Sequence, residues 1–185
     1  MRSWKGPGPE VVTHPRPRET GIIPCHLVAI VLFVSACVKQ IMELGRRFPW
    51  PRPERCPRCG SVRLWGHGFV VAYFDDVPEA VFLKRYRCPD CRAVIRLRPR
   101  GYWSRFQASA AAIRQSLFRK LIWGRWDPRL PRSRQRHWLK GLLRQVGLHL
   151  GSAWSGDLLW AFDCLHERGL AAASRSAQSE SPFPP

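Results

Sequence analysis

Four of the seven cysteines stand in two Cys-x-x-Cys pairs, and this spacing has the clearest chemical meaning in the chain. The pairs are Cys56/Cys59 and Cys88/Cys91. Two residues between thiols let both sulfurs reach one ion, and Gly60, directly after the first pair, tolerates the tight turn that this requires. Four thiolates form a closed structural zinc site with no position left for a reactive water. The sequence therefore predicts one structural Zn²⁺ held by these four cysteines.

Two other interpretations of the cysteines are four ordinary thiols and a redox-active pair. A thioredoxin-like pair would stand at the start of a helix in a βαβ unit, and the surrounding sequence lacks that pattern. His67, between the pairs, is more typical of a turn than of a fifth ligand, because four sulfurs complete the coordination. Paired rather than dispersed cysteines favour a reducing compartment, so we expect a cytoplasmic protein.

Short strands surround the cysteine pairs. Segments 69–74, 81–87 and 93–98 are rich in Val, Phe, Tyr and Ile, and the turn residues lie at 66–68 and 75–78. About 50 residues rarely bury enough apolar surface to fold alone, whereas a structural zinc contributes roughly 10–16 kcal/mol. We therefore expect residues 50–100 to form a small β zinc ribbon.

The charge balance points to a polyanionic partner. The 185 residues contain 31 Lys and Arg against 13 Asp and Glu, a net charge of +18. Such a field attracts nucleic acid first and an anionic membrane surface second. Alternation along the strands places ribbon arginines on shared faces, where their guanidinium forks would match phosphates, although a solvated charged face is the plainer alternative. The predicted phosphate contacts are Arg85, Arg87, Arg96, Arg98 and Arg100.

After Pro99 the apolar period changes to that of helices. We predict three helices, at 104–123, 133–150 and 157–168, with Ser104 and Ser155 as N-caps of the first and third. Together they form a helical DNA-binding-like unit over residues 103–169.

The second predicted helix has one apolar and one basic side. Its basic side carries Arg136, Lys140 and Arg144, opposite Trp138 and Leu142. In a helix-turn-helix these three side chains would read bases in the major groove. The connector before this helix is about eight or nine residues, longer than the three or four of the standard motif, so a purely structural bundle is the alternative.

The two ends of the chain are expected to lie outside the fold. Residues 27–38 form an apolar run shorter than the roughly 20 residues that span a bilayer. We interpret residues 1–41 as an extension or as the product of an incorrect start before Met42; a buried or interfacial segment and an export signal are alternatives. Residues 170–185, rich in Ala, Ser and Pro, are predicted to be a disordered tail.

Three sequence runs carry a resemblance to a known family. They are CPRCG at 56–60, LWGHGF at 64–69 and RYRCPDC at 85–91. With the following helical segment, over about residues 50–150, they resemble the zinc-ribbon plus helix-turn-helix N-terminal region of bacterial insertion-sequence transposases, or a short stand-alone relative of it. The resemblance implies binding to element-end DNA, with the four paired cysteines as the metal ligands.

A catalytic domain is missing from this pattern. Full transposases of this kind carry an RNase H-like domain with three well-separated carboxylates, whereas Asp157, Asp163 and Glu167 share one predicted helix, too local for a two-metal site. The sequence also lacks a phosphate-cradling Gly-Lys loop, a nucleophile elbow and a His-Glu-x-x-His motif. We therefore expect a protein that is not an enzyme.

These observations predict an α+β protein, with a small β zinc ribbon followed by a three-helix, helix-turn-helix-like unit and disordered termini. The expected function is that of a zinc-stabilised DNA-binding protein, a transposase-related accessory or non-catalytic fragment. The alternative is an interaction module that docks on a transposase or other nucleic-acid machinery, because seven tryptophans between Trp65 and Trp160 exceed what a small core needs. RNA stays open as a partner, since phosphate attraction does not distinguish it from DNA, and membrane association is not expected.

Overall fold

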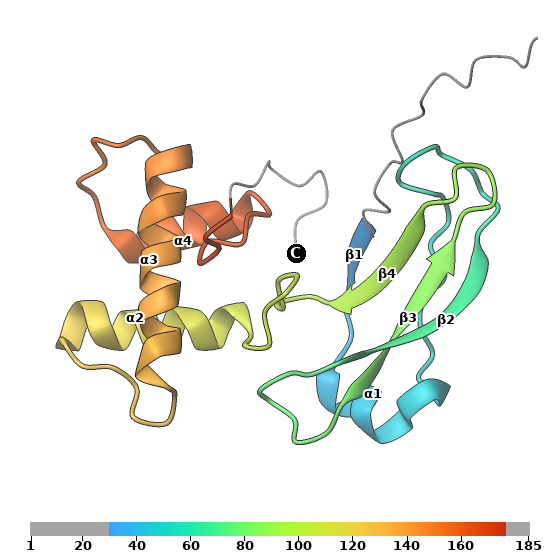
Figure 1. Ribbon diagram of the computed structural model, residues 1–185, viewed down its shortest axis with the longest axis horizontal. Helices are drawn as coiled ribbons and strands as arrows, with labels where there is room; N and C mark the ends of the chain where they lie inside the picture. Colours follow the sequence, from blue (N-terminus) through green and yellow to red (C-terminus); the bar gives the residue numbers. More distant parts are fainter. Residues whose placement is uncertain (1–29, 177–185) are drawn as a thin grey trace, which may run out of the picture.

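The computed structural model describes residues 30–176, which form an α+β fold with one four-stranded sheet and four α-helices. In Figure 1 the sheet and α1 lie on the right, and α2, α3 and α4 lie on the left. The elements are β1 (Ile30–Val34), α1 (Val38–Leu44), the short 3₁₀ helix η1 (Gly45–Arg47), β2 (Trp65–Ala72), β3 (Val81–Arg87), β4 (Val94–Pro99), α2 (Ala110–Trp123), α3 (Arg132–His149) and α4 (Leu158–Glu167).

The sheet has the order β1-β4-β3-β2, and its first strand comes from the segment expected to lie outside the fold. β1 runs parallel to β4, with Ile30 opposite Ile95 and Leu32 opposite Leu97. α1 follows, and its Val38 and Ile41 are buried against the sheet. This differs from the sequence interpretation of residues 1–41, because the apolar side chains of residues 30–41 complete the sheet and its core. Residues 1–29 lie outside the described part.

β2 starts earlier than predicted. The expected turn at 66–68 lies inside this strand, where the pairing with β3 shifts register between Gly66 and Phe69. Gly68 has a φ of +69°, which a side chain would strain. The glycines therefore make a bulge that bends a continuous strand, rather than a turn that begins one.

Three helices pack around one apolar core in the second half of the chain. Trp103, Leu117, Leu142 and Phe162 are among its most deeply buried members. α2 begins at Ala110 rather than near residue 104, because the Ser109 hydroxyl accepts a hydrogen bond from the Ala112 backbone N–H.

The boundaries of the other helices follow the same capping rules. Asp157, not Ser155, caps α4, and its carboxylate accepts a hydrogen bond of 2.6 Å from the Leu159 N–H. Gly124 ends α2 in the left-handed conformation, in agreement with the predicted helix end at residue 123.

The long connector between α2 and α3 is held by one buried side chain. The Gln135 amide oxygen accepts hydrogen bonds from the Ser116 hydroxyl at 2.7 Å and the Asp127 N–H at 2.9 Å. Its nitrogen donates to the Asp127 and Leu130 carbonyl oxygens, at 2.8 and 2.9 Å. The connector is therefore a fixed loop, because opening it would leave these buried polar groups unpaired.

The segment after α4 is folded, which differs from the predicted disordered tail of residues 170–185. Leu170 and the three alanines after it are buried. Gln145 of α3 donates hydrogen bonds of 2.8 Å to the Ser174 and Ser176 carbonyl oxygens. At Gly141 a Cβ would lie 2.0 Å from the Ala173 oxygen, so the segment lies directly against α3 where that helix has no side chain. Residues 177–185 lie outside the described part.

Candidate metal centre and basic surfaces

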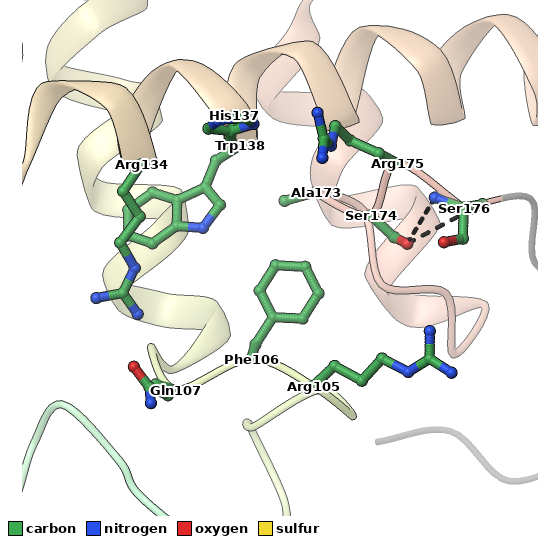
Figure 2. A pocket seen from close by; sticks show the side chains of 10 residues that line it. All are labelled: Arg105, Phe106, Gln107, Arg134, His137, Trp138, Ala173, Ser174, Arg175 and Ser176. Carbon is green, nitrogen blue, oxygen red and sulfur yellow. Dashed lines mark hydrogen bonds between the residues drawn. The ribbon is translucent and has the colours of Figure 1, made fainter.

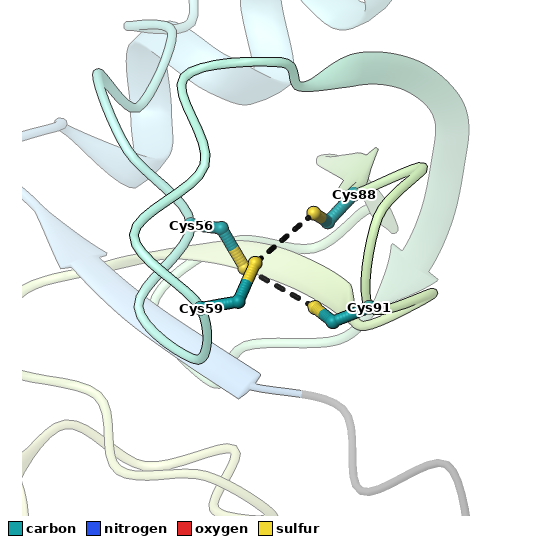
Figure 3. Close-up of side chains that lie close together, drawn as sticks. All are labelled: Cys56, Cys59, Cys88 and Cys91. Carbon is teal, nitrogen blue, oxygen red and sulfur yellow. Dashed lines mark hydrogen bonds between the residues drawn. The ribbon is translucent and has the colours of Figure 1, made fainter.

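The side chains of the four paired cysteines lie close together, as Figure 3 shows. Cys56 and Cys59 lie in the loop before β2, and Cys88 and Cys91 lie between β3 and β4. All four sulfurs lie within 4.8 Å of one another, with 3.6 Å between Cys56 and Cys91 and between Cys59 and Cys88. Four thiolates around one zinc, each about 2.3 Å from it, lie about 3.8 Å apart. The cluster can therefore hold one metal ion.

The two cysteine loops have matching backbone turns. The residue after the second cysteine of each pair takes a positive φ, +72° at Gly60 and +59° at Arg92. The Cys56 N–H donates to the Ser61 oxygen at 2.8 Å, and the Cys88 N–H donates to the Ala93 oxygen at 3.0 Å. Each loop thus presents its sulfurs toward the other.

The electrostatics of the cluster suit a bound cation. Hydrogen bonds from the backbone N–H groups of Cys91 and Asp90 lower the pKa of the Cys88 thiol to about 7. At Cys59 the Ser61 N–H also lowers the pKa, but desolvation and the neighbouring sulfurs outweigh it and raise the pKa to about 12. Four crowded thiols cannot all ionise without a positive charge among them, and a divalent metal supplies that charge.

An ion pair joins the two cysteine loops at the surface. The Arg63 guanidinium donates to the Asp90 carboxylate. A hydrogen bond from Ser61 and this guanidinium lower the pKa of Asp90. The contact connects the first loop to the second beside the sulfurs.

Four of the five predicted ribbon arginines reach the surface. Arg85 lies opposite Arg96 in the β3–β4 ladder, and both are half-buried, while Arg87 and Arg100 are exposed. None of these four forms an ion pair with an acidic group between residues 30 and 176. They remain candidates for phosphate contact.

Arg98 does not belong to this surface. It is only 6% exposed, and its Nε donates a 2.8 Å hydrogen bond to the Tyr102 oxygen. A second nitrogen donates to the Phe106 oxygen, and the guanidinium lies 4.8 Å from the centre of the Phe74 ring. Burial lowers the pKa of Arg98 to about 10. The side chain therefore fixes the turn that leads into α2 and cannot contact a phosphate.

Arg136, Lys140 and Arg144 are all exposed on one side of α3. The opposite side carries Trp138 and Leu142 into the helical core. In the part of the chain that the structure describes, the three cations form no ion pair. We call these three residues the α3 basic face.

The carboxylates of α4 have structural partners. Asp157 caps the helix, and Asp163 accepts two hydrogen bonds from Arg114 of α2, at 2.7 and 2.6 Å. Glu167, one turn further on, is exposed. Two of the three acidic groups therefore hold helices in place.

Two contacts between the loop after β2 and residues later in the chain were not predicted from the sequence. Arg134 of α3 forms a 2.7 Å ion pair with Asp75 in the loop after β2, and the Tyr102 hydroxyl donates to Asp76. The sequence signal for them was the acidic pair Asp75 and Asp76 in a strongly basic chain, and these two residues were interpreted as part of the turn at 75–78.

No protein-family model matches the chain, and no curated protein or solved structure is significantly similar to it. Among the helices of residues 30–176, none has the length and apolar character needed to cross a membrane.

Proposed function

We propose that this protein is a zinc-stabilised nucleic-acid-binding protein whose α3 basic face contacts duplex DNA. The observation that carries the proposal is the α3 basic face, with three exposed cations that have no acidic partner among the described residues. The net charge of +18 also favours binding of nucleic acid, because it raises the local concentration of polyanions around the protein.

The ligand chemistry supports zinc as the metal. Thiolates are soft ligands that select zinc and similar ions over magnesium or calcium. Four of them saturate a tetrahedral ion, which favours a structural role. The sheet is small, so a metal between its loops would supply much of the free energy that folds it.

The geometry of α3 supports a helix that enters a groove. An α-helix fits the major groove of B-DNA, and cations four residues apart lie along one side of it. Gln135 fixes the entry to α3, and the segment after α4 lies along another side of it. A helix held in this way presents its basic side chains without first having to be ordered.

We propose a role in binding mobile-element DNA, either as an accessory of a transposase or as a non-catalytic relative of one. The support is the resemblance of the cysteine loops and the following helices to transposase N-terminal regions. The proposed role is binding rather than catalysis, consistent with the structural partners of Asp157 and Asp163.

The test is the affinity for duplex DNA as a function of salt. Each neutralised phosphate releases condensed counterions, so the logarithm of the binding constant should fall with the logarithm of salt concentration at a slope of about −0.9 per contact. Fluorescence anisotropy with labelled DNA and RNA duplexes of the same sequence measures this slope for both. Absence of binding at low salt, or binding that salt does not weaken, would contradict the proposal.

A second candidate function is docking of a protein strand on β2. β2 lies at the edge of the sheet, and Trp65 at its start and Tyr73 just after it are 61% and 62% exposed. An open edge strand can pair with an extended segment of another protein. In that case Trp65→Ser would remove binding of a transposase to this chain, while duplex affinity would be weak from the start.

A further inference from the structure

A cavity of about 510 Å³ lies between the loop that leads into α2, the first turns of α3 and the segment after α4 (Figure 2). Its volume is typical of sites for small organic ligands and larger than a phosphate alone needs. Its lining includes three arginines and one aromatic ring that faces the space, namely Arg105, Arg134, Arg175 and Phe106.

The lining is basic and includes no carboxylate among the described residues. Arg134 pairs with Asp75 at the edge of the cavity. Arg105 and Arg175 form no ion pair with an acidic group between residues 30 and 176. Two such guanidinium groups in one concave site repel each other, and an anion placed between them would relieve that repulsion.

One aromatic ring, that of the half-buried Phe106, and the Arg134 guanidinium plane accompany the charge, whereas Trp138 is only 4% exposed and packs in the helical core. Figure 2 shows the Phe106 ring pointing into the space below Trp138. The Arg134 guanidinium lies 5.1 Å from the centre of the Trp138 ring. Unpaired bases stack on aromatic and guanidinium planes, and Gln107, Ser174 and Ser176 supply polar groups for a base edge. An anion with a flat ring, which is the chemistry of a nucleotide, fits this lining.

The cavity is held open by contacts outside it. Arg105 has a φ of +68°, a conformation that is strained for a residue with a side chain and that persists only where the surroundings impose it. Arg98 imposes it here, because its hydrogen bonds fix Tyr102 and Phe106 on either side. Gln145 fixes the opposite wall at Ser174 and Ser176.

The cavity adjoins the α3 basic face. His137 lines the cavity, and Lys140 follows it three residues later on the same side of the helix. We propose that the cavity takes one unstacked nucleotide, at an end or an unpaired position, of the nucleic acid that the α3 basic face binds. This inference rests on the proposed function and adds the form of nucleic acid that the protein prefers.

The test compares three labelled duplexes of one sequence by fluorescence anisotropy. One is blunt, one carries a single unpaired nucleotide at its end, and one carries an abasic unit at that position, which keeps the phosphate and removes the base. We expect the full chain to bind the unpaired nucleotide about tenfold more tightly than the blunt or abasic ends, because a stacked base contributes that much. Free deoxyadenosine monophosphate should compete for the unpaired end.

The variant Arg105→Gln/Arg175→Gln should lose this preference. The matched control, Arg47→Gln/Arg125→Gln, removes the same charge at two exposed sites outside the cavity and should keep it. Both variants should keep the melting temperature of the parent chain, which separates loss of the site from loss of the fold.

Three outcomes would overturn the inference. Equal affinity for all three duplexes, or a preference that survives Arg105→Gln/Arg175→Gln, would remove the cavity as a nucleotide site and leave the proposed function standing. The third outcome is binding of deoxyadenosine monophosphate at the cavity without any binding of a duplex. It would overturn the proposed function, and it would show that the cavity binds a free nucleotide rather than one that belongs to a nucleic acid.

Discussion

The sheet half of the molecule, residues 30–100, divides its buried apolar side chains between two clusters, whereas the helical half, residues 101–176, gathers all of its own except Tyr102 in one. One cluster of the sheet half lies under α1 around Ile41 and Leu83, and the other lies beside the cysteines around Leu64 and Ile95. The helical cluster brings together residues from all three helices and from the segment after α4.

This difference indicates how each half is stabilised. Small clusters contribute little free energy, so we expect the sheet half to depend on the cross-link that a bound metal would make between its two cysteine loops. The helical half has a larger core, side-chain caps on α2 and α4 and a fixed connector. We therefore expect the two halves to respond differently to the same treatments.

Loss of the metal should have the largest effect. In Cys88→Ser, or after chelation, we expect loss of about 10–16 kcal/mol of metal-binding free energy and unfolding of the cysteine loops and β2 to β4. Hydrogen exchange should show fast amides there and protected amides in α2 and α3. Cys164→Ser, on α4, is the control and should keep full metal content. Equal loss of protection in both halves would show one cooperative unit and contradict the comparison.

A substitution that removes side-chain atoms from the helical core should have the second largest effect. Leu142→Ala should lower the free energy of unfolding by about 2–5 kcal/mol, because Leu142 is fully buried, and should leave the metal content unchanged. The neighbour Leu143, 50% exposed, provides the matched control, and its change to Ala should cost less than about 0.5 kcal/mol. Denaturant titration measures both. Similar values for the two variants would show that this core does not stabilise the helical half.

Arg98→Met should affect stability rather than binding. It removes two hydrogen bonds from a charged donor to the Tyr102 and Phe106 oxygens, at a cost of about 2–3 kcal/mol in the free energy of unfolding. Arg96→Met, two residues earlier, should hardly change stability but should reduce the salt slope of duplex binding by about one. A reduced salt slope in the Arg98 variant, with unchanged stability, would show that Arg98 contacts the duplex and would contradict its structural role.

The pH dependence from His166 should be the smallest effect. Burial lowers the pKa of His166, whose neutral ring accepts a hydrogen bond of 3.3 Å from the Trp103 indole N–H. The unfolded chain takes up this proton first, so stability should fall as the pH drops below about 6.5, by about 1.4 kcal/mol for each unit of pKa lowering.

Thermal melts between about pH 7.5 and pH 5.5 test this, since that range spans the ordinary pKa of histidine. The wild type should lose more stability on acidification than His166→Gln. His67→Gln is the control and should follow the wild type, so that any effect of acid on the metal cancels. Parallel curves for all three proteins would exclude His166 as the source.

Local patterns in the sequence predicted much of this structure. The Cys-x-x-Cys spacing brings two sulfurs together within one turn, and the helix ends at Gly124 and Gly151 need only a local left-handed residue. β1 could not be predicted in the same way, because Ile30 pairs with Ile95, far along the chain.

Two further differences have physical causes that a pattern does not contain. The alternation of residues along a strand predicts which face of the sheet Arg98 lies on, but it does not predict how deeply the side chain is buried. The turn after β4 covers its guanidinium group. The alanines after α4 have the composition of a disordered tail, but they pack against α3 because Gly141 has no Cβ there and Gln145 donates hydrogen bonds to Ser174 and Ser176. Arg98, expected to bind phosphate, therefore fixes the turn between β4 and α2, and the alanines, expected to be disordered, pack within the helical half.

Binding of duplex DNA to the α3 basic face is tested most directly by the duplex affinity of a variant in which this face has lost its charge. The variant Arg136→Gln/Lys140→Gln/Arg144→Gln should reduce the salt slope by about 2.7, which corresponds to three lost phosphate contacts. The control Arg47→Gln/Arg55→Gln/Arg125→Gln removes the same charge at exposed sites elsewhere and should leave the slope close to that of the wild type. Equal slopes in the two variants would contradict the claim, because binding would then depend on total charge and not on α3.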